Sequence, residues 1–396
     1  MAISLSKISA DRLEAFGDRV ARQYAVSILP SIGKIEMFLT EDCTLRCDYC
    51  FVRNKSHLKR MSWETAKKAV DFLIGNSSPN SELDITFFGG EPLMEFALIK
   101  RIAAYARERA NEAEKEIRFA LTTNGTIMNE EIAGFGLEYG FNILVSIDGD
   151  REAHDLHRVY EGGRKGSWDK VVGKSLPLLK SIQGWIGARV TVNPDTASCL
   201  LSGVRKLFDI GVNQFLIGPN FDAEWTQEEM EVLSSEMHKV VDFYLEAKGK
   251  GLPIRIAEFE KSIEDMRSTH RHTWGCDAGV AKVAISPTGD MYPCSKFVSP
   301  FPGMEGYKLG DLDSGFTDIR TRMDFIANDA GRRTKCANCD ISDICNGGCP
   351  ATNLYKECSL FIPSAFECFS KRLYFELLAR IPTEMLVPDA QEQKHS

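Results

Sequence analysis

Three cysteines lie close together in the segment CTLRCDYC, at Cys43, Cys47 and Cys50. The run KIEMFLT directly before them predicts a strand, so a single loop can bring three thiolates to one metal centre. Three protein ligands leave one coordination position open. That arrangement is typical of a catalytic zinc site, and also of a four-iron cluster that exposes one iron to a small molecule. The C-x3-C-x2-C spacing favours the cluster.

A second group of cysteines falls in the last third of the chain, at Cys276, Cys294, Cys336, Cys339, Cys345, Cys349, Cys358 and Cys368. Four of them are spaced C-x2-C-x5-C-x3-C, which taken alone predicts a zinc site. The positions of the others, with Gly289 between the first two, favour a larger metal-binding domain. The remaining cysteine, Cys199, stands alone in a predicted helix, and we expect it to pack in the core.

The composition of the chain excludes several functional classes. At 396 residues, with 43% hydrophobic and 26% charged residues, it is typical of a globular protein of one large or two joined domains. No run approaches the ~20 apolar residues of a membrane span. The N-terminus lacks the pattern of a secretory signal, so we predict a cytoplasmic protein without a disulfide scaffold. A net charge of −8 disfavours a nucleic-acid partner and favours a peptide or small-molecule substrate.

Between Gly33 and Pro219, short apolar runs alternate with amphipathic stretches of helical length. The alternation predicts about six βα units, an α/β fold of the partial (β/α)6 TIM-like barrel type. Chemistry in such folds gathers where the strands end. The first cysteines follow one predicted strand, and the GGEP turn, Asn124 and Asp148 follow the next three. We therefore expect one rim to collect these residues.

The chain divides into four predicted segments. An N-terminal helical segment covers residues 1–32, the barrel and its linker helix cover 33–255, the cysteine-rich domain covers 256–380 and a tail covers 381–396. The cysteine-rich part consists of short strand-like pieces with little apolar periodicity. We expect metal centres to hold it together.

The first cysteine triplet, with the aromatic Tyr49 before its third member, resembles the radical S-adenosylmethionine (SAM) superfamily over roughly residues 34–220. In that family the three cysteines hold a 4Fe-4S cluster whose open iron binds SAM. One electron then cleaves SAM to methionine and a 5'-deoxyadenosyl radical. The resemblance implies an oxidoreductase that abstracts hydrogen from its substrate, with a reductant such as flavodoxin or ferredoxin as a partner.

The resemblance also implies a set of SAM contacts, which is Tyr49, Gly89, Gly90, Glu91, Asn124, Ser146, Asp148, Arg158 and Ile217. The glycines would let SAM approach the backbone, and Glu91 would accept a hydrogen bond from its amino group. Ser146 and Asp148 would contact the ribose. Arg158 would pair with the SAM carboxylate as a planar fork, and Ile217 would touch adenine. Taken singly, the glycines would form an ordinary turn and Arg158 a surface ion pair.

The second cysteine group resembles the SPASM domain, which carries auxiliary 4Fe-4S clusters in radical SAM enzymes that modify peptides and proteins. By resemblance, an outer cluster is held by Cys336, Cys339, Cys345 and Cys368, and an inner cluster by Cys276, Cys294 and Cys349. The inner cluster then lacks a fourth cysteine. Either Cys358 supplies it or one iron stays open, and Cys358 is equally well interpreted as an inert thiol.

The resemblance implies two reactions on a peptide. Sulfatase-maturating enzymes oxidise cysteine or serine to formylglycine, with an aspartate after the second SPASM cysteine as the proposed base, and Ser295 at that position disfavours this reaction. The surrounding segment is instead similar to maturases of ribosomally synthesised peptides (RiPPs), which form thioether, carbon–carbon or ether crosslinks. We predict crosslinking, with formylglycine formation as the alternative. A general base is not identified, because His154, His157 and Asp277 are candidates by proximity alone.

The sequence leads to one expectation about a partner for peptide recognition and one about a non-enzymatic alternative. Many such maturases carry an N-terminal peptide-recognition domain, for which the residues before Cys43 are too few. We therefore expect a separate recognition protein or a peptide site on the barrel. A non-enzymatic iron–sulfur electron carrier or a zinc-binding module is the alternative of another class. The GGEP and SIDG segments disfavour it, because such a protein needs no SAM pocket.

Overall fold

The computed structural model describes residues 29–53, 55, 59–79, 81–163, 165–260, 276–326, 333–342, 345, 347–382 and 385. The predicted N-terminal helical segment and C-terminal tail lie almost wholly outside the described residues. In the described part of the chain, no helix is long and apolar enough to cross a membrane.

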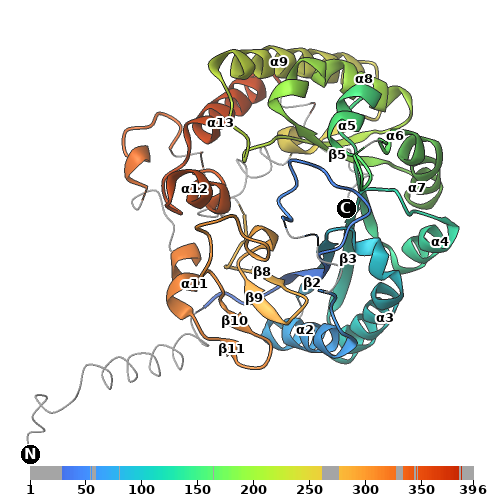
Figure 1. Cartoon of the computed structure of the whole chain (residues 1–396), viewed down its shortest axis with the longest axis vertical. Helices are drawn as coiled ribbons and strands as arrows, with labels where there is room; N and C mark the ends of the chain where they lie inside the picture. Colours follow the sequence, from blue (N-terminus) through green and yellow to red (C-terminus); the bar gives the residue numbers. More distant parts are fainter. Residues whose placement is uncertain are drawn as a thin grey trace, which may run out of the picture.

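Six parallel strands form the centre of the molecule: β1 (Lys34–Thr40), β2 (Glu82–Gly89), β3 (Glu116–Thr123), β4 (Asn142–Ser146), β5 (Gly187–Val192) and β6 (Gln214–Pro219). They pair in chain order, each parallel to the next. The helices between and after them are α2 (Trp63–Asn76), α3 (Phe96–Glu112), α4 (Glu130–Tyr139), α5 (Arg151–His157), α6 (Trp168–Lys170), α7 (Leu176–Gln183), α8 (Leu200–Asp209) and α9 (Gln227–Gly249). These helices cover the outer face of the curved sheet (Figure 1). The predicted α/β class is confirmed.

The burial pattern of β1 shows that alternate side chains of a strand lie in different surroundings. Ile35, Met37 and Leu39 are fully buried and belong to the main hydrophobic core, whereas Glu36 between them is partly exposed. Successive side chains of a strand point to opposite faces, so Glu36 lies on the concave side of the sheet. A charged side chain therefore faces the interior of the barrel.

Helix ends follow local sequence signals. Ser62 begins α2, and its side chain accepts a hydrogen bond from the backbone N–H of Thr65. Thr226 and Glu229 form a reciprocal capping box at the start of α9. Gly140 ends α4 with a φ of 64°, a conformation that glycine adopts without steric cost. Such signals position the loops at the two ends of the sheet.

The sheet continues beyond both ends of the six strands. Strand β7 (Arg255–Ile256) pairs with β6, and β8 (Lys282–Ile285) pairs in parallel with β1. Strands β9 (Asp290–Tyr292), β10 (Gly310–Asp311) and β11 (Gly315–Phe316) extend it antiparallel. Among the described residues, β7 and β11 are the edges, so strand pairing leaves the sheet open. The cysteine-rich region thus begins as an extension of the barrel sheet.

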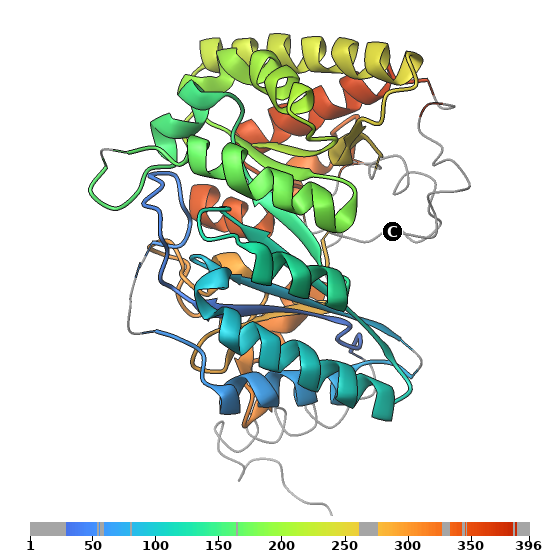
Figure 2. The same ribbon diagram turned by 90° about the vertical axis from the view of Figure 1, so that its right-hand side faces the viewer.

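Three helices follow: α11 (Ile319–Ile326), α12 (Pro350–Glu357) and α13 (Ala365–Leu378). Helix α13 lies alongside α9 (Figures 1 and 2). Arg380, just after α13, forms an ion pair with Asp242 of α9. Leu373 and Leu377 of α13 join the main core, while α11 and α12 contribute to a smaller second core with Phe297 and Phe325. The C-terminal region is therefore anchored to the barrel by apolar packing as well as by the sheet.

Candidate cluster and cofactor sites

The loop after β1 carries the first cysteine triplet. Cys43 is 8% exposed, and Cys47 and Cys50 are partly buried. The Cys43 sulfur accepts long hydrogen bonds from the Leu45 N–H (3.4 Å) and from Asn124 Nδ2 (3.5 Å). Burial raises the pKa of Cys47 to about 12. Metal binding at these thiols must therefore displace protons.

The GGEP turn at the end of β2 holds the beginning of this loop. The backbone N–H of Gly90 donates to Thr40 O at 2.8 Å, and that of Glu91 donates to Asp42 O at 2.9 Å. A Cβ atom on Gly89 would lie 2.3 Å from Thr40 O, and one on Gly90 would lie 2.1 Å from Asp42 O. The predicted reason for the glycines was space for SAM. The space where their side chains would stand is filled by the backbone of the cysteine loop, and the contact with SAM stays a prediction.

Glu91 extends this contact to the end of β3. It is fully buried; its Oε1 accepts from Thr123 Oγ1 (2.8 Å) and its Oε2 from the backbone N–H of Asn124 (2.7 Å). Burial raises the pKa of Glu91 to about 7. Asn124 in turn donates from Nδ2 to Thr44 Oγ1 at 3.0 Å. The ends of β1, β2 and β3 are therefore joined around the triplet, as the rim prediction required.

Asp148 and Arg158 form a buried pair below Tyr49. Arg158 donates from Nε to Asp148 Oδ2 (2.7 Å) and from Nη2 to Oδ1 (3.0 Å). Asp148 also accepts from the Tyr49 hydroxyl (2.5 Å) and the Thr191 N–H (2.9 Å). Although burial opposes it, Arg158 holds the pKa of Asp148 below its usual value. The fork predicted for the SAM carboxylate is thus occupied by Asp148, whose acceptor positions are all used, leaving none for a ribose hydroxyl.

The two other predicted SAM contacts differ in accessibility. Ser146 is the last residue of β4, is partly exposed and pairs in register with Arg189 of β5. Ile217 lies in β6 with 1% of its surface exposed, inside the main core. Adenine has no access to the Ile217 side chain in this structure, because neighbouring core residues surround it. Of these two residues, Ser146 is the more accessible.

His154 and His157, the two histidines named as candidate general bases, both contact other side chains of the protein. His154 is fully buried, accepting from the Asp148 N–H at 3.4 Å through Nδ1 and contacting Ser167 Oγ at 2.8 Å through Nε2. His157 lies between two carboxylates, Asp48 at 2.9 Å and Asp195 at 3.1 Å. Asp48 belongs to the cysteine loop, so His157 ties that loop to the segment after β5.

Burial lowers the pKa of His154 to about 3. A histidine with a depressed folded-state pKa stabilises the fold above its unfolded value near 6.5 and loses that contribution as the pH falls. Between pH 6.5 and pH 5, we expect the free energy of unfolding of His154→Gln to fall by about 2 kcal/mol less than that of the natural chain. Urea titrations at several pH values measure this slope. His238→Gln, on the surface of α9, is the control, and equal slopes for His154→Gln and the natural chain would refute the assignment.

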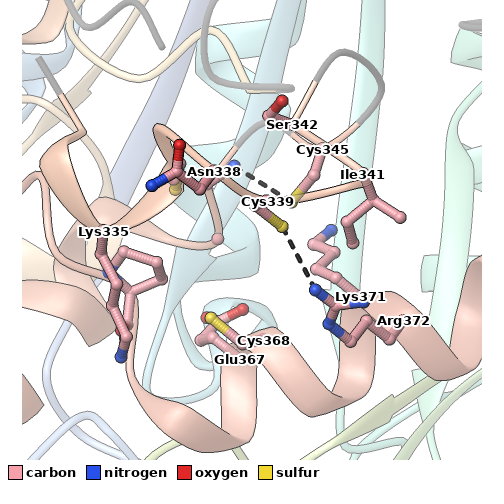
Figure 3. A pocket seen from close by; sticks show the side chains of 14 residues that line it. Lys335, Asn338, Cys339, Ile341, Ser342, Cys345, Glu367, Cys368, Lys371 and Arg372 are labelled. Carbon is pink, nitrogen blue, oxygen red and sulfur yellow. Dashed lines mark hydrogen bonds between the residues drawn. The ribbon is translucent and has the colours of Figure 1, made fainter. Parts of the chain in front are cut away.

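The four cysteines predicted to hold an outer cluster line one cavity of about 300 Å³ (Figure 3). Cys336, Cys339 and Cys345 come from the loop before α12, and Cys368 comes from the first turn of α13. Arg372 donates to the Cys339 sulfur at 3.4 Å. The grouping inferred from sequence is therefore a grouping in space.

The three cysteines predicted for an inner cluster are also neighbours. Burial is the main cause that raises the pKa of Cys276 and of Cys294. The negative charge of the Cys349 thiolate raises both pKa values further. Lys282 of β8 is close enough to Cys276 and Cys294 for their charge to raise its own pKa. In the chain, Cys294 follows β9 and Cys349 directly precedes α12.

Cys358 stands apart from this set. Cys349 is the residue before α12 and Cys358 the residue after it, so the helix separates them by about 13 Å at 1.5 Å per residue. Cys358 is exposed and adopts a φ of 53°, as the last residue of a helix often does. We expect Cys358→Ser to retain the iron content of the natural chain after anaerobic reconstitution, whereas Cys294→Ser should lose iron. A loss with Cys358→Ser would show that it is a ligand.

A carboxylate that the sequence did not single out lies beside Ser295. Glu36 accepts from the Ser295 N–H at 2.8 Å and from its hydroxyl, and Lys282 donates to Glu36 at 2.8 Å. Lys282 and Ser295 together hold the pKa of Glu36 below its usual value despite burial. The position where an aspartate was expected for formylglycine chemistry therefore has a carboxylate next to it, supplied by β1.

The donor sets fit iron–sulfur clusters. Three thiols lie in the loop after β1, four line one cavity, and Cys276, Cys294 and Cys349 form a third group, which is the 3, 4 and 3 division that the resemblance implied. Among the described residues, no three His, Cys, Asp or Glu side chains are arranged around one ion. Each thiolate of a cubane binds a different iron, so such thiols need not converge on a single point.

The chain resembles known proteins over this site. Residues 37–174 match the radical SAM superfamily. An uncharacterized protein of Methanocaldococcus jannaschii is 34% identical over 174 residues, which are 44% of this chain and 58% of that protein. A cysteine-type anaerobic sulfatase-maturating enzyme of Clostridium novyi is 24% identical over 78% of this chain and 85% of its own length. The radical SAM cyclopropyl synthase TigE of Paramaledivibacter caminithermalis is 23% identical, over 80% and 68%.

Two solved structures share the fold. Native anSMEcpe with bound AdoMet and the Kp18Cys peptide superposes with a TM-score of 0.71 at 20% identity, covering 89% of this chain and 98% of that one. Streptococcus suis SuiB bound to its precursor peptide SuiA superposes with a TM-score of 0.60 at 17% identity, covering 90% and 80%. The α/β fold described above is therefore the fold of these proteins.

Proposed function

We propose that this chain, which has a radical SAM domain and counts sulfatase-maturating enzymes and peptide maturases among its relatives, modifies a peptide or protein substrate by forming a crosslink. The observation that carries the proposal is the separation of the cysteines into one rim triplet and two C-terminal groups. A simple electron carrier has no use for a triplet at the rim of a barrel. Solved structures of the same fold bind the Kp18Cys and SuiA peptides, which supports a peptide substrate.

In the proposed enzyme, Cys43, Cys47 and Cys50 hold a 4Fe-4S cluster with one open iron for SAM. Together these cofactors supply one-electron reduction and hydrogen abstraction. The protein's contribution is positional. Gly90 and Glu91 fix the start of the cysteine loop, Asp148 and Arg158 fix Tyr49 within it, and His157 fixes Asp48. Among the predicted SAM contacts, Ser146 is partly exposed, and we assign a SAM contact to it. Glu91 is fully buried, and the side-chain amide of Asn124 is already bonded within the protein.

We assign two auxiliary clusters to the C-terminal region. Cys336, Cys339, Cys345 and Cys368 hold the outer one in their shared cavity. Cys276, Cys294 and Cys349 hold the inner one, and one of its irons has no cysteine ligand because α12 keeps Cys358 away. A cluster held there by Cys276, Cys294 and Cys349 alone would supply a binding site for a substrate thiolate, which favours a thioether among the crosslinks.

Formylglycine formation is the second candidate, and one contact favours it. The carboxylate of Glu36 touches Ser295, so a proton acceptor stands where the sequence lacked one. Glu36 faces the concave side of the sheet, from which a substrate would approach. Glu36→Gln separates the candidates, since it removes the acceptor while preserving the shape. Loss of activity with Glu36→Gln would favour formylglycine formation.

Iron content and SAM cleavage test the proposal. After anaerobic reconstitution we expect about twelve irons per chain, and 5'-deoxyadenosine on addition of SAM and dithionite. About four irons would mean that the C-terminal cysteines bind another metal. The absence of 5'-deoxyadenosine would leave only an electron carrier.

The product distinguishes the two reactions by mass. A crosslink removes two hydrogens from the peptide and retains sulfur, whereas conversion of cysteine to formylglycine removes two hydrogens and also replaces the sulfur with oxygen. The substrates to compare are a sulfatase-type cysteine peptide and a small peptide encoded beside the gene. A crosslink formed in a cysteine-free peptide would refute the thioether version.

A further inference from the structure

The cavity of the outer cysteines opens at the protein surface. Lys335 and Arg372, which line it, and Asp340 beside it are exposed, and the Arg372 side chain is 50% accessible. Lys335 and Arg372 stand on opposite sides of the cavity, one from the loop before α12 and one from α13 (Figure 3). A molecule seated on this edge would lie directly over the four thiols.

The charges around the cavity contrast with those of the whole chain. The net charge of the protein is −8, yet the described residues that line the cavity include Lys335, Lys371 and Arg372 and a single carboxylate, Glu367. Glu367 is 2% exposed and accepts from the Cys349 N–H at 3.1 Å, so it faces inward. Asp340, outside the cavity, is paired with Arg372. Asp340 compensates the charge of Arg372, so among the described residues Lys335 on one side of the cavity and Lys371 on the other leave the edge cationic (Figure 3).

We propose that Lys335, Lys371 and Arg372 form the docking surface for an acidic one-electron carrier protein. The inference rests on the proposed function, because it takes the four thiols to hold a redox centre. One electron passes between the carrier and that centre, so that one is oxidised as the other is reduced. Complementary charge accelerates such encounters and fixes their orientation. A small anion is a poorer occupant, because the thiols and their centre fill the cavity beneath the lysines.

Binding of an acidic flavodoxin to the reconstituted protein tests this surface. The double variant Lys335→Gln/Lys371→Gln removes two charges and keeps Arg372, which contacts Cys339. The control Lys67→Gln/Lys174→Gln removes two charges from exposed positions on α2 and before α7. At low ionic strength we expect the first variant to raise the Kd of flavodoxin about tenfold and the control to leave it unchanged. The difference should shrink as salt is added.

Three results would overturn the docking surface: equal Kd values for the two variants, binding that does not depend on salt, or a changed cluster potential with unchanged binding. The last would mean that the lysines only compensate the charge of the cluster. Iron content and the electron paramagnetic resonance of the clusters, measured on each variant, verify that both variants keep their clusters. A natural chain that lacks iron in the outer cavity would contradict the proposed function, whereas flavodoxin binding to the lysines would still be measurable.

Discussion

Alanine in place of Gly90 should prevent assembly of the cluster on the first triplet and lower the iron content from about twelve to about eight per chain. A Cβ at this position would lie 2.1 Å from Asp42 O and 2.7 Å from Glu41 O. Both are backbone atoms, so the cysteine loop must move to relieve the overlap. The movement also breaks the hydrogen bond from the Gly90 N–H to Thr40 O. Cleavage of SAM should be lost with the iron.

The control for this prediction is Gly75→Ala in α2, where a Cβ would have no neighbour within 4 Å. It should retain full iron content. Circular dichroism of both variants checks that the barrel is folded. If Gly90→Ala kept about twelve irons, the loop would not depend on the turn, and space for SAM would again be the better explanation for the glycine.

The cysteine groups could be predicted because the spacing of the cysteines resembles that of the SPASM domain. Cys336, Cys339 and Cys345 are close in the chain, and Cys368 joins them in one cavity through α13. The βα alternation likewise predicted the six central strands, which are short and mostly apolar, as in KIEMFLT of β1. The sheet extension was not predicted, since β7, β10 and β11 each contain two residues and show no periodicity.

The partners of individual charged residues were beyond sequence reasoning. Glu36 and Ser295 are 259 positions apart and meet because β8 pairs with β1. Arg158 and Asp148 are ten positions apart, yet their pairing depends on the return of the chain through α5. The resemblance assigned the glycines of the GGEP turn to the approach of SAM to the backbone. What fills the space beside them, the backbone of the cysteine loop, became known only from the fold.

Replacing Asp148 by asparagine should lower the free energy of unfolding by about 3–5 kcal/mol, since it leaves the Arg158 guanidinium buried without a counter-charge. Both side chains are nearly inaccessible, at 1% and 8%. The variant also weakens the hydrogen bond from Tyr49, which lies between Cys47 and Cys50. We therefore expect lower stability together with weaker retention of the first cluster. Urea titration under anaerobic conditions and iron analysis measure the two effects.

Asp169→Asn is the matched control, because Asp169 forms an ion pair with Arg151 that is exposed on both sides. Exposed pairs contribute little, so this variant should unfold like the natural chain. The double variant Asp148→Asn/Arg158→Met removes the unpaired charge and should recover part of the lost stability. Recovery would establish that the buried cation, and not the loss of hydrogen bonds to Tyr49 and Thr191, dominates the cost. A single Asp148→Asn variant as stable as the natural chain would mean that water reaches Arg158 and that the pair is not sealed.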